Sequence, residues 1–182
     1  ELGVDVAIHG GVILAGASFD DVGVSLNQGS AYVFLRPLGG WSGVIGHSAQ
    51  LVASDGHDGD LFGSRVAIAG GSLVVSAPYA DVTRDNQGAA YVFNLPISGW
   101  TGTLTEDAKL TAGATASINA NFGGGLAAVG ETIVVGALVP ISRLVCEKLP
   151  ADTWHGVADF AKTYEYPWGI AGFIACAAAM PT

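Results

Sequence analysis

The hexapeptide Gly29-Ser30-Ala31-Tyr32-Val33-Phe34 returns 59 residues later as Gly88-Ala89-Ala90-Tyr91-Val92-Phe93, and this repeated stretch decides the fold. An Asn-Gln pair precedes both copies, at Asn27-Gln28 and at Asn86-Gln87. Self-similarity at a fixed period is the sequence signature of proteins that stack one supersecondary unit several times. The chain is therefore predicted to be an array of one unit of about 60 residues.

Two further motifs precede the hexapeptide and extend the array to three copies. The first begins at Val6, Val66 and Leu126, at intervals of 60 residues. An apolar run follows it in each copy and ends in a pair of small residues: Gly16-Ala17, Ser76-Ala77 and Gly136-Ala137. The units are predicted to span residues 1–61, 62–121 and, in diverged form, 122–163. The tail 164–182 matches no unit; it could be the first strand of a missing unit, a cap over an open edge or a result of truncation.

A tryptophan recurs in a Pro-x-x-x-Trp-x-Gly pattern, at Trp41, Trp100 and Trp154. Positions that repeat with the unit usually encode packing, and a large aromatic side chain buries much surface. We therefore expect these side chains to be wedges between the edges of neighbouring units, and we assign them to no ligand.

Short runs rich in Val, Ile, Tyr and Phe, bounded by Gly, Asp, Asn and Pro, indicate strands. In the second unit they cover residues 65–69, 72–77, 89–94 and 108–112, and the Gly70-Gly71 pair suits a tight hairpin turn. A four-stranded sheet that is apolar on both faces must stack on other sheets. The sequence predicts an all-β partial β-propeller of about three four-stranded antiparallel blades, the third diverged.

Composition narrows the range of functions. The net charge of −9 opposes sequence-independent binding of nucleic acid, because that affinity comes from Lys and Arg. The apolar run 169–180 is shorter than the ~20 residues that a membrane span needs. We find no nucleophile paired with a base, no zinc spacing and no phosphate loop, so no enzyme is predicted.

The two cysteines, Cys146 and Cys176, have no zinc or redox spacing, and either buried thiols or a disulfide would fit.

The residues at the start of the units and at the end of their apolar runs resemble a known family. Phe62-Gly63, Ser76-Ala77-Pro78 and Phe122-Gly123 are similar to the Phe-Gly and Gly-Ala-Pro signatures of the FG-GAP repeat, which forms the blades of integrin α-subunit propellers. The first unit departs slightly, with Leu2-Gly3. The resemblance covers residues 1 to about 156 and implies an extracellular or cell-surface propeller, as in bacterial secreted proteins, used for adhesion or ligand binding and often carrying calcium.

The family's Asp-x-Asp-x-Asp-Gly calcium loop does not occur here, but one acidic turn is a candidate for Ca²⁺. Asp55, Asp58 and Asp60 lie among glycines and could offer hard oxygen ligands. A solvated turn between units is the alternative, because calcium wants six to eight oxygens and the corresponding stretch of the third unit has no acid.

A second candidate site is the long loop between the second and third strands of the first two units. It contains Asp20 and Asp21 in one unit and Asp81 and Asp85 in the next. Loops on a rigid scaffold often bind ligands, although Asp in a turn also bonds its own backbone.

These observations lead to one expected function and two alternatives. We expect a non-catalytic binding or adhesion module, part of a larger extracellular protein, with a protein or glycan ligand and with further blades from the parent chain or an oligomer. The alternatives are a scaffold propeller attached to a secreted hydrolase and a calcium-dependent surface protein.

Overall fold

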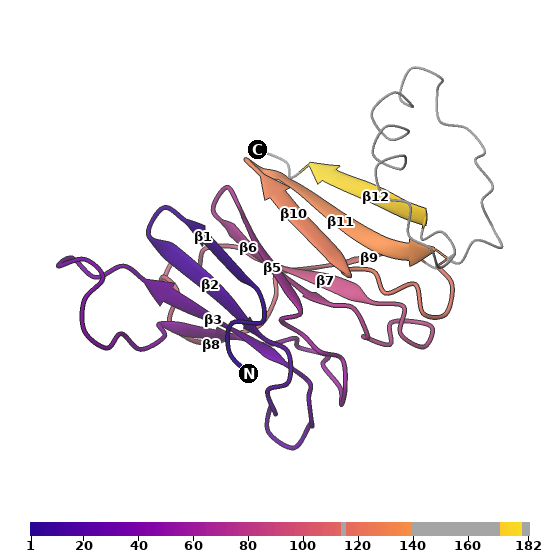
Figure 1. Cartoon of the computed structure of the whole chain (residues 1–182), viewed down its shortest axis with the longest axis horizontal. Coiled ribbons are helices and arrows are strands. Elements are labelled where there is room, and N and C mark those ends of the chain that lie inside the picture. The colour runs from indigo at the N-terminus through magenta and orange to yellow at the C-terminus, as the bar shows by residue number, and fades with distance from the viewer. Residues whose placement is uncertain (114–115, 140–171, 180–182) are drawn as a thin grey trace, which may run out of the picture.

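The computed structural model of the chain describes residues 1–113, 116–139 and 172–179, the last segment and residues 138–139 as backbone only. Within these ranges every regular element is a β-strand, which confirms the all-β prediction. Three sheets lie side by side (Figure 1). Among the described residues, no helix is long and apolar enough to cross a membrane.

The first sheet contains the four expected strands of the first unit and one strand from the second unit. Its own strands are antiparallel and consecutive: β1 (Val6–His9), β2 (Val12–Ala17), β3 (Ser30–Leu35) and β4 (Ala49–Leu51). The fifth strand, β8 (Gly102–Leu104), pairs parallel with β4. This parallel pair links neighbouring units.

The second sheet has the strand pattern that the sequence predicts. It is formed by β5 (Arg65–Ala69), β6 (Ser72–Ala77), β7 (Ala89–Phe93) and β9 (Ala108–Thr111), all antiparallel. Ala69 pairs with Ser72, so Gly70 and Gly71 form a two-residue hairpin turn. Gly70 has a φ of 59°, a conformation that glycine adopts without a steric penalty.

The third sheet has two strands from the third unit and one from the tail. β10 (Gly125–Val129) and β11 (Thr132–Val139) form its hairpin, and β12 (Gly172–Ala179) pairs antiparallel with β11. The rest of the predicted third unit, residues 140–163 with Cys146 and Trp154, lies outside the described residues. Residues 172–179 thus supply an edge strand that the alignment did not predict.

Each sheet has two faces, and stacking buries one against the next. We call the face of the second sheet that carries Leu73, Val75 and Tyr91 its front face, and the face that carries Val74 and Val92 its back face. The names apply to equivalent positions in the other sheets, so Leu14 and Val33 lie on the back face of the first sheet.

Two apolar clusters fill the spaces between the sheets. One joins the back face of the first sheet to the front face of the second. The other joins the back face of the second sheet to Ile133, Val135 and neighbours of the third. Trp100 is buried in the first cluster, as a packing wedge would be, whereas Trp41 is 41% exposed. The array is a partial propeller and is not closed.

Candidate functional site

The Phe-Gly pair of the second unit forms the joint with the first unit. Phe62 is fully buried between the two sheets, and its ring meets those of Tyr91 and Phe93 edge to face, at centroid distances of 5.3 and 6.1 Å. This geometry suits the charge distribution of aromatic rings. Phe62 therefore anchors the linker of one unit in the core that both units share.

Gly63, the second residue of this pair, lies too close to the preceding unit to carry a side chain. Its φ is 94°, and a Cβ atom would lie 2.9 Å from the Ala17 amide nitrogen and would collide with the Ser30 carbonyl oxygen. Its amide donates to the Ser76 carbonyl oxygen at 2.9 Å. Gly123 repeats the arrangement in the third unit, with a φ of 94°.

The repeated Asn-Gln pair fastens the same joint from the other side. The Phe62 amide donates to the Gln28 carbonyl oxygen at 2.8 Å, and the Phe122 amide donates to the Gln87 carbonyl oxygen at 2.9 Å. The Gln87 side chain is buried and donates to the Gly113 carbonyl oxygen at 2.7 Å. A buried amide must find such partners, which explains why Gln recurs here.

The structure gives the four loop aspartates different surroundings. The carboxylate of Asp20 is half-buried and accepts hydrogen bonds from the Ser30 and Tyr32 hydroxyls, both at 2.6 Å. Burial of the Tyr32 side chain raises its pKa, and the hydrogen bond to the Asp20 carboxylate raises this pKa further. Asp20 therefore holds its own loop against β3.

Asp21 and Asp81 occupy equivalent positions on the two loops and form the same turn. Asp21 accepts from the Asn27 amide at 2.8 Å, and Asp81 accepts from the Asn86 amide at 2.7 Å. Both carboxylates are exposed, as is Asp85. Three of the four predicted loop residues thus lie on the surface, close to the joint between units.

The acidic turn 55–60 lies beside these loops, but its three carboxylates have separate partners. Asp55 accepts from Lys109 Nζ at 2.6 Å and from the Tyr91 hydroxyl at 3.1 Å. Burial alone would raise the pKa of Asp55, but the hydrogen bond and charge of Lys109 bring it below its usual value. Asp58 accepts from the Leu26 amide at 3.1 Å.

Asp60 is the buried member of the acidic turn, with 4% of its surface exposed. Its carboxylate accepts from the His57 amide at 2.8 Å. Burial raises the pKa of Asp60, because the charged form loses water that one hydrogen bond does not replace. Asp60 therefore closes the turn from inside. In a fully solvated turn its carboxylate would instead face water, and it does not.

Within residues 1–113 and 116–139, no group of three or more His, Cys, Asp and Glu side chains is placed to hold a metal ion.

We expect millimolar Ca²⁺ to leave the melting temperature unchanged, because Asp55, Asp58 and Asp60 each accept hydrogen bonds from a different internal partner. Differential scanning calorimetry with Ca²⁺ and with a chelator measures this. A rise in melting temperature that disappears in the Asp58→Asn variant would show that the turn binds calcium.

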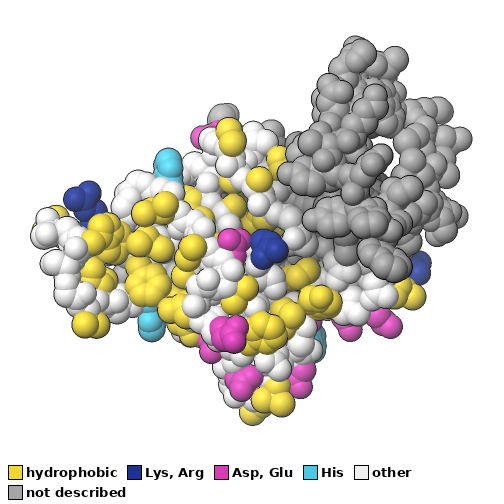
Figure 2. All heavy atoms as spheres, viewed as in Figure 1, with side chains coloured by type: hydrophobic (Ala, Val, Ile, Leu, Met, Phe, Trp, Pro, Cys, Tyr) yellow, Lys and Arg dark blue, Asp and Glu magenta, His cyan; other side chains and the backbone are white. Residues whose placement is uncertain are grey.

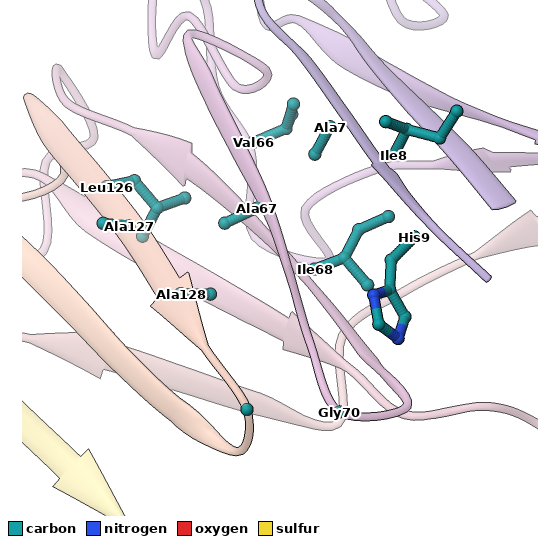
Figure 3. Close-up of a pocket in the computed structure, with 11 residues that line it drawn as sticks. Ala7, Ile8, His9, Val66, Ala67, Ile68, Gly70, Leu126, Ala127 and Ala128 are labelled. Carbon is teal, nitrogen blue, oxygen red and sulfur yellow. The ribbon is translucent and has the colours of Figure 1, made fainter.

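A groove of about 510 Å³ runs between the first strands of the three sheets, β1, β5 and β10 (Figure 3). Its side chains are mainly aliphatic, among them Ala7, Ile68 and Leu126, with His9 at one end (Figure 3). First strands surround the axis in a closed propeller. The groove is therefore the open side of the propeller axis, and the three strands that line it are edge strands of their sheets.

Sequence reasoning missed a set of exposed apolar side chains on the two long loops. Phe19, Val24 and Leu26 are between half and almost fully exposed on the first loop, and Tyr79 is 45% exposed on the second. Figure 2 shows acidic and apolar side chains gathered at the lower edge of the molecule. We call the two loops together with the turn 55–60 the loop edge. The alternation of Asp with large apolar residues was a signal that could have identified it.

Comparison with protein families gives a match over the stretch that contains this joint. A family model described as the FG-GAP repeat matches residues 46–93, a stretch that begins just before β4, includes Phe62-Gly63 and ends at β7. The chain contains an FG-GAP repeat. The signature residues of the FG-GAP repeat are thus the residues that join one unit to the next.

FG-GAP repeats are generally non-catalytic, and they occur in extracellular or surface proteins. A search of curated protein sequences gives no match to the chain.

Proposed function

We propose that the chain is a non-catalytic binding or adhesion module of an extracellular or cell-surface protein, and that it binds a protein or glycan ligand on its loop edge. The observation that carries this proposal is the exposure of Phe19, Leu26 and Tyr79 on loops whose bases are fixed by buried hydrogen bonds. Exposed aromatic side chains on a rigid base lose little entropy on binding and dominate many interfaces.

The loop bases supply the rigidity that this proposal requires. Asp20 bonds two hydroxyls of β3, and the Gln28 carbonyl oxygen bonds the next unit. On the second loop, Gln87 Oε1 accepts from the Thr83 hydroxyl at 2.9 Å. The loop tips are therefore held in place before a ligand arrives, which lowers the ordering cost of binding.

Charge defines the kind of ligand that the loop edge favours. Asp21, Asp58, Asp81 and Asp85 are exposed on the same loops and turn as the apolar side chains, and the whole chain carries a net charge of −9. Complementary charge speeds association and selects partners. A ligand with basic groups beside an apolar or aromatic surface fits this edge better than an acidic one.

The double variant Phe19→Ser/Tyr79→Ser tests this function. Binding of the fluorescently labelled chain is measured on an array of surface glycans and on immobilised extracellular-matrix proteins. Where the wild-type chain binds, we expect at least ~10-fold weaker binding by the variant, because truncation of a hot-spot side chain typically costs about 2 kcal/mol or more and about 1.4 kcal/mol is a factor of ten.

The matched control is Leu38→Ser/Ile97→Ser, which removes two fully exposed apolar side chains from loops that follow the third strand of each unit. The strand order places these loops at the end of the sheets opposite the loop edge. Equal losses in both double variants, or no loss in the first, would contradict the proposed binding edge.

A further inference from the structure

The turn that leads into the second unit contains a buried carboxylate, whereas the equivalent turn of the third unit does not. Asp60 is 4% exposed, and Ala120, which lies 60 residues later at the same repeat position, is also 4% exposed. Each stands two residues before the Phe of a Phe-Gly pair, next to a joint between units. The same buried place is therefore filled by a charged side chain in one joint and by a methyl group in the next.

The backbone of the two turns is held in the same way, whichever side chain is present. The Asp60 amide donates to the His57 carbonyl oxygen at 3.3 Å, and the Ala120 amide donates to the Ser117 carbonyl oxygen at the same distance. In both turns the amide of the preceding residue donates, at 2.9 Å, to a carbonyl oxygen of the long loop in the unit before. The turn therefore does not need a carboxylate to adopt its backbone conformation.

The carboxylate has a cost in this place that the methyl group does not have. Burial is the main influence on the pKa of Asp60 and raises it, because the charged form loses its water. The hydrogen bond from the His57 amide and the charges of His57 and Lys109 lower this pKa, while the charge of Asp81 raises it. Tyr91 on β7 is a further titratable group close enough to sense the charge of Asp60. The neutral form of Asp60 thus fits the joint better than the charged form.

We propose that Asp60 makes the joint between the first and second units sensitive to pH, so that uptake of one proton by its carboxylate strengthens this joint. The joint between the second and third units, with Ala120 at the equivalent position, lacks this response. The proposal does not rest on the binding function of the loop edge, and the failure of either leaves the other standing.

The direction of the effect follows from the raised pKa of Asp60. An acid whose pKa is higher in the folded chain contributes stability that is fully present below its unfolded pKa of about 4, and that is lost as the pH rises through the folded value. The joint should therefore gain stability as the pH falls from neutral towards 4.5. Asp55 has a lowered pKa and acts in the opposite direction, but its contribution is lost only below about pH 4.

Urea denaturation of the full chain at pH 7.5 and at pH 4.5, followed by tryptophan fluorescence, tests the proposal. The quantity compared is the shift of the urea midpoint between the two pH values, so a uniform loss of stability in a variant does not affect the result. We expect the wild-type midpoint to move further towards high urea at pH 4.5 than that of Asp60→Ala. Asp60→Asn keeps the size of the side chain and should lose the same part of the shift. A chelator in every sample removes any contribution from metal ions.

Two controls separate Asp60 from its neighbours in the turn. Asp58→Asn removes an exposed carboxylate, and His57→Gln removes an imidazole but keeps the amide that Asp60 accepts from. Both variants should keep the wild-type shift. Relief of repulsion among the other acids of this chain is common to all variants and cancels in the comparison. Equal shifts in the wild-type chain and both Asp60 variants would overturn the proposal, as would loss of the shift in His57→Gln.

Discussion

Replacing Phe62 by Ala is expected to lower the free energy of unfolding by about 3–5 kcal/mol, the range for removing a fully buried Phe. The ring is completely buried and contacts two other aromatic rings in the cluster shared by the first and second sheets. The sheets on either side are held by hydrogen-bonded strands, so they cannot easily move together to fill the space. Urea denaturation followed by tryptophan fluorescence measures the loss, and Trp100 in the same cluster reports on it directly.

Leu2→Ala is the matched control for Phe62→Ala. Leu2 stands at the same repeat position but is 58% exposed, because no unit precedes it in the structure. A surface change of this kind typically stays within about 0.5 kcal/mol. If both variants lost the same stability, the Phe-Gly pair would act within its own unit and not as a joint between units.

The architecture could be predicted because the repeat and the turn residues can both be recognised directly in the sequence. Three copies in register predict stacked sheets, and the Gly70-Gly71 pair predicts a two-residue hairpin that the pairing of Ala69 with Ser72 confirms. The four strands of the second sheet were predicted to within a residue at each end, whereas β8 of the same unit was not predicted. These features depend on residues close together in sequence, whose backbone preferences are strong.

Features that depend on contacts between units were not predictable in the same way. The parallel pairing of β8 with β4 joins Gly102–Leu104 to a strand some 50 residues earlier, and no periodicity marks it. Strand β12 replaces a repeat position with a segment that has no repeat pattern. The roles of the acids also depend on distant partners, as when Asp55 meets Lys109. The sequence identified these carboxylates as candidate ligands, but it did not show that they accept hydrogen bonds from groups inside the fold.

The family's Phe-Gly signature acquires a physical meaning from this arrangement. Its Phe fills the space between two sheets, and its Gly permits the approach of the next backbone to the small pair that ends the preceding unit's second strand. Gly16 belongs to that pair, and a Cβ atom there would collide with the Gly63 carbonyl oxygen. The two halves of the signature are therefore complementary surfaces of neighbouring units.

Gly63→Ala should show how much of this complementarity is steric. Gly63 has a φ of 94°, which costs an alanine on the order of 1–2 kcal/mol. The added methyl group would also press on the Ser30 carbonyl oxygen and on the Ala17 amide, and overpacking of this kind costs roughly 1–3 kcal/mol. We expect a total loss of about 2–5 kcal/mol in urea denaturation.

Gly3→Ala separates the two contributions, because Gly3 has nearly the same φ, 90°, and open space around it. It should lose only the backbone contribution, about 1–2 kcal/mol. The difference between the two variants then measures the steric contribution of the joint, free of the shared conformational cost. Equal losses would mean that glycine is required at this position for its backbone alone, and that the closeness of neighbouring units does not select it.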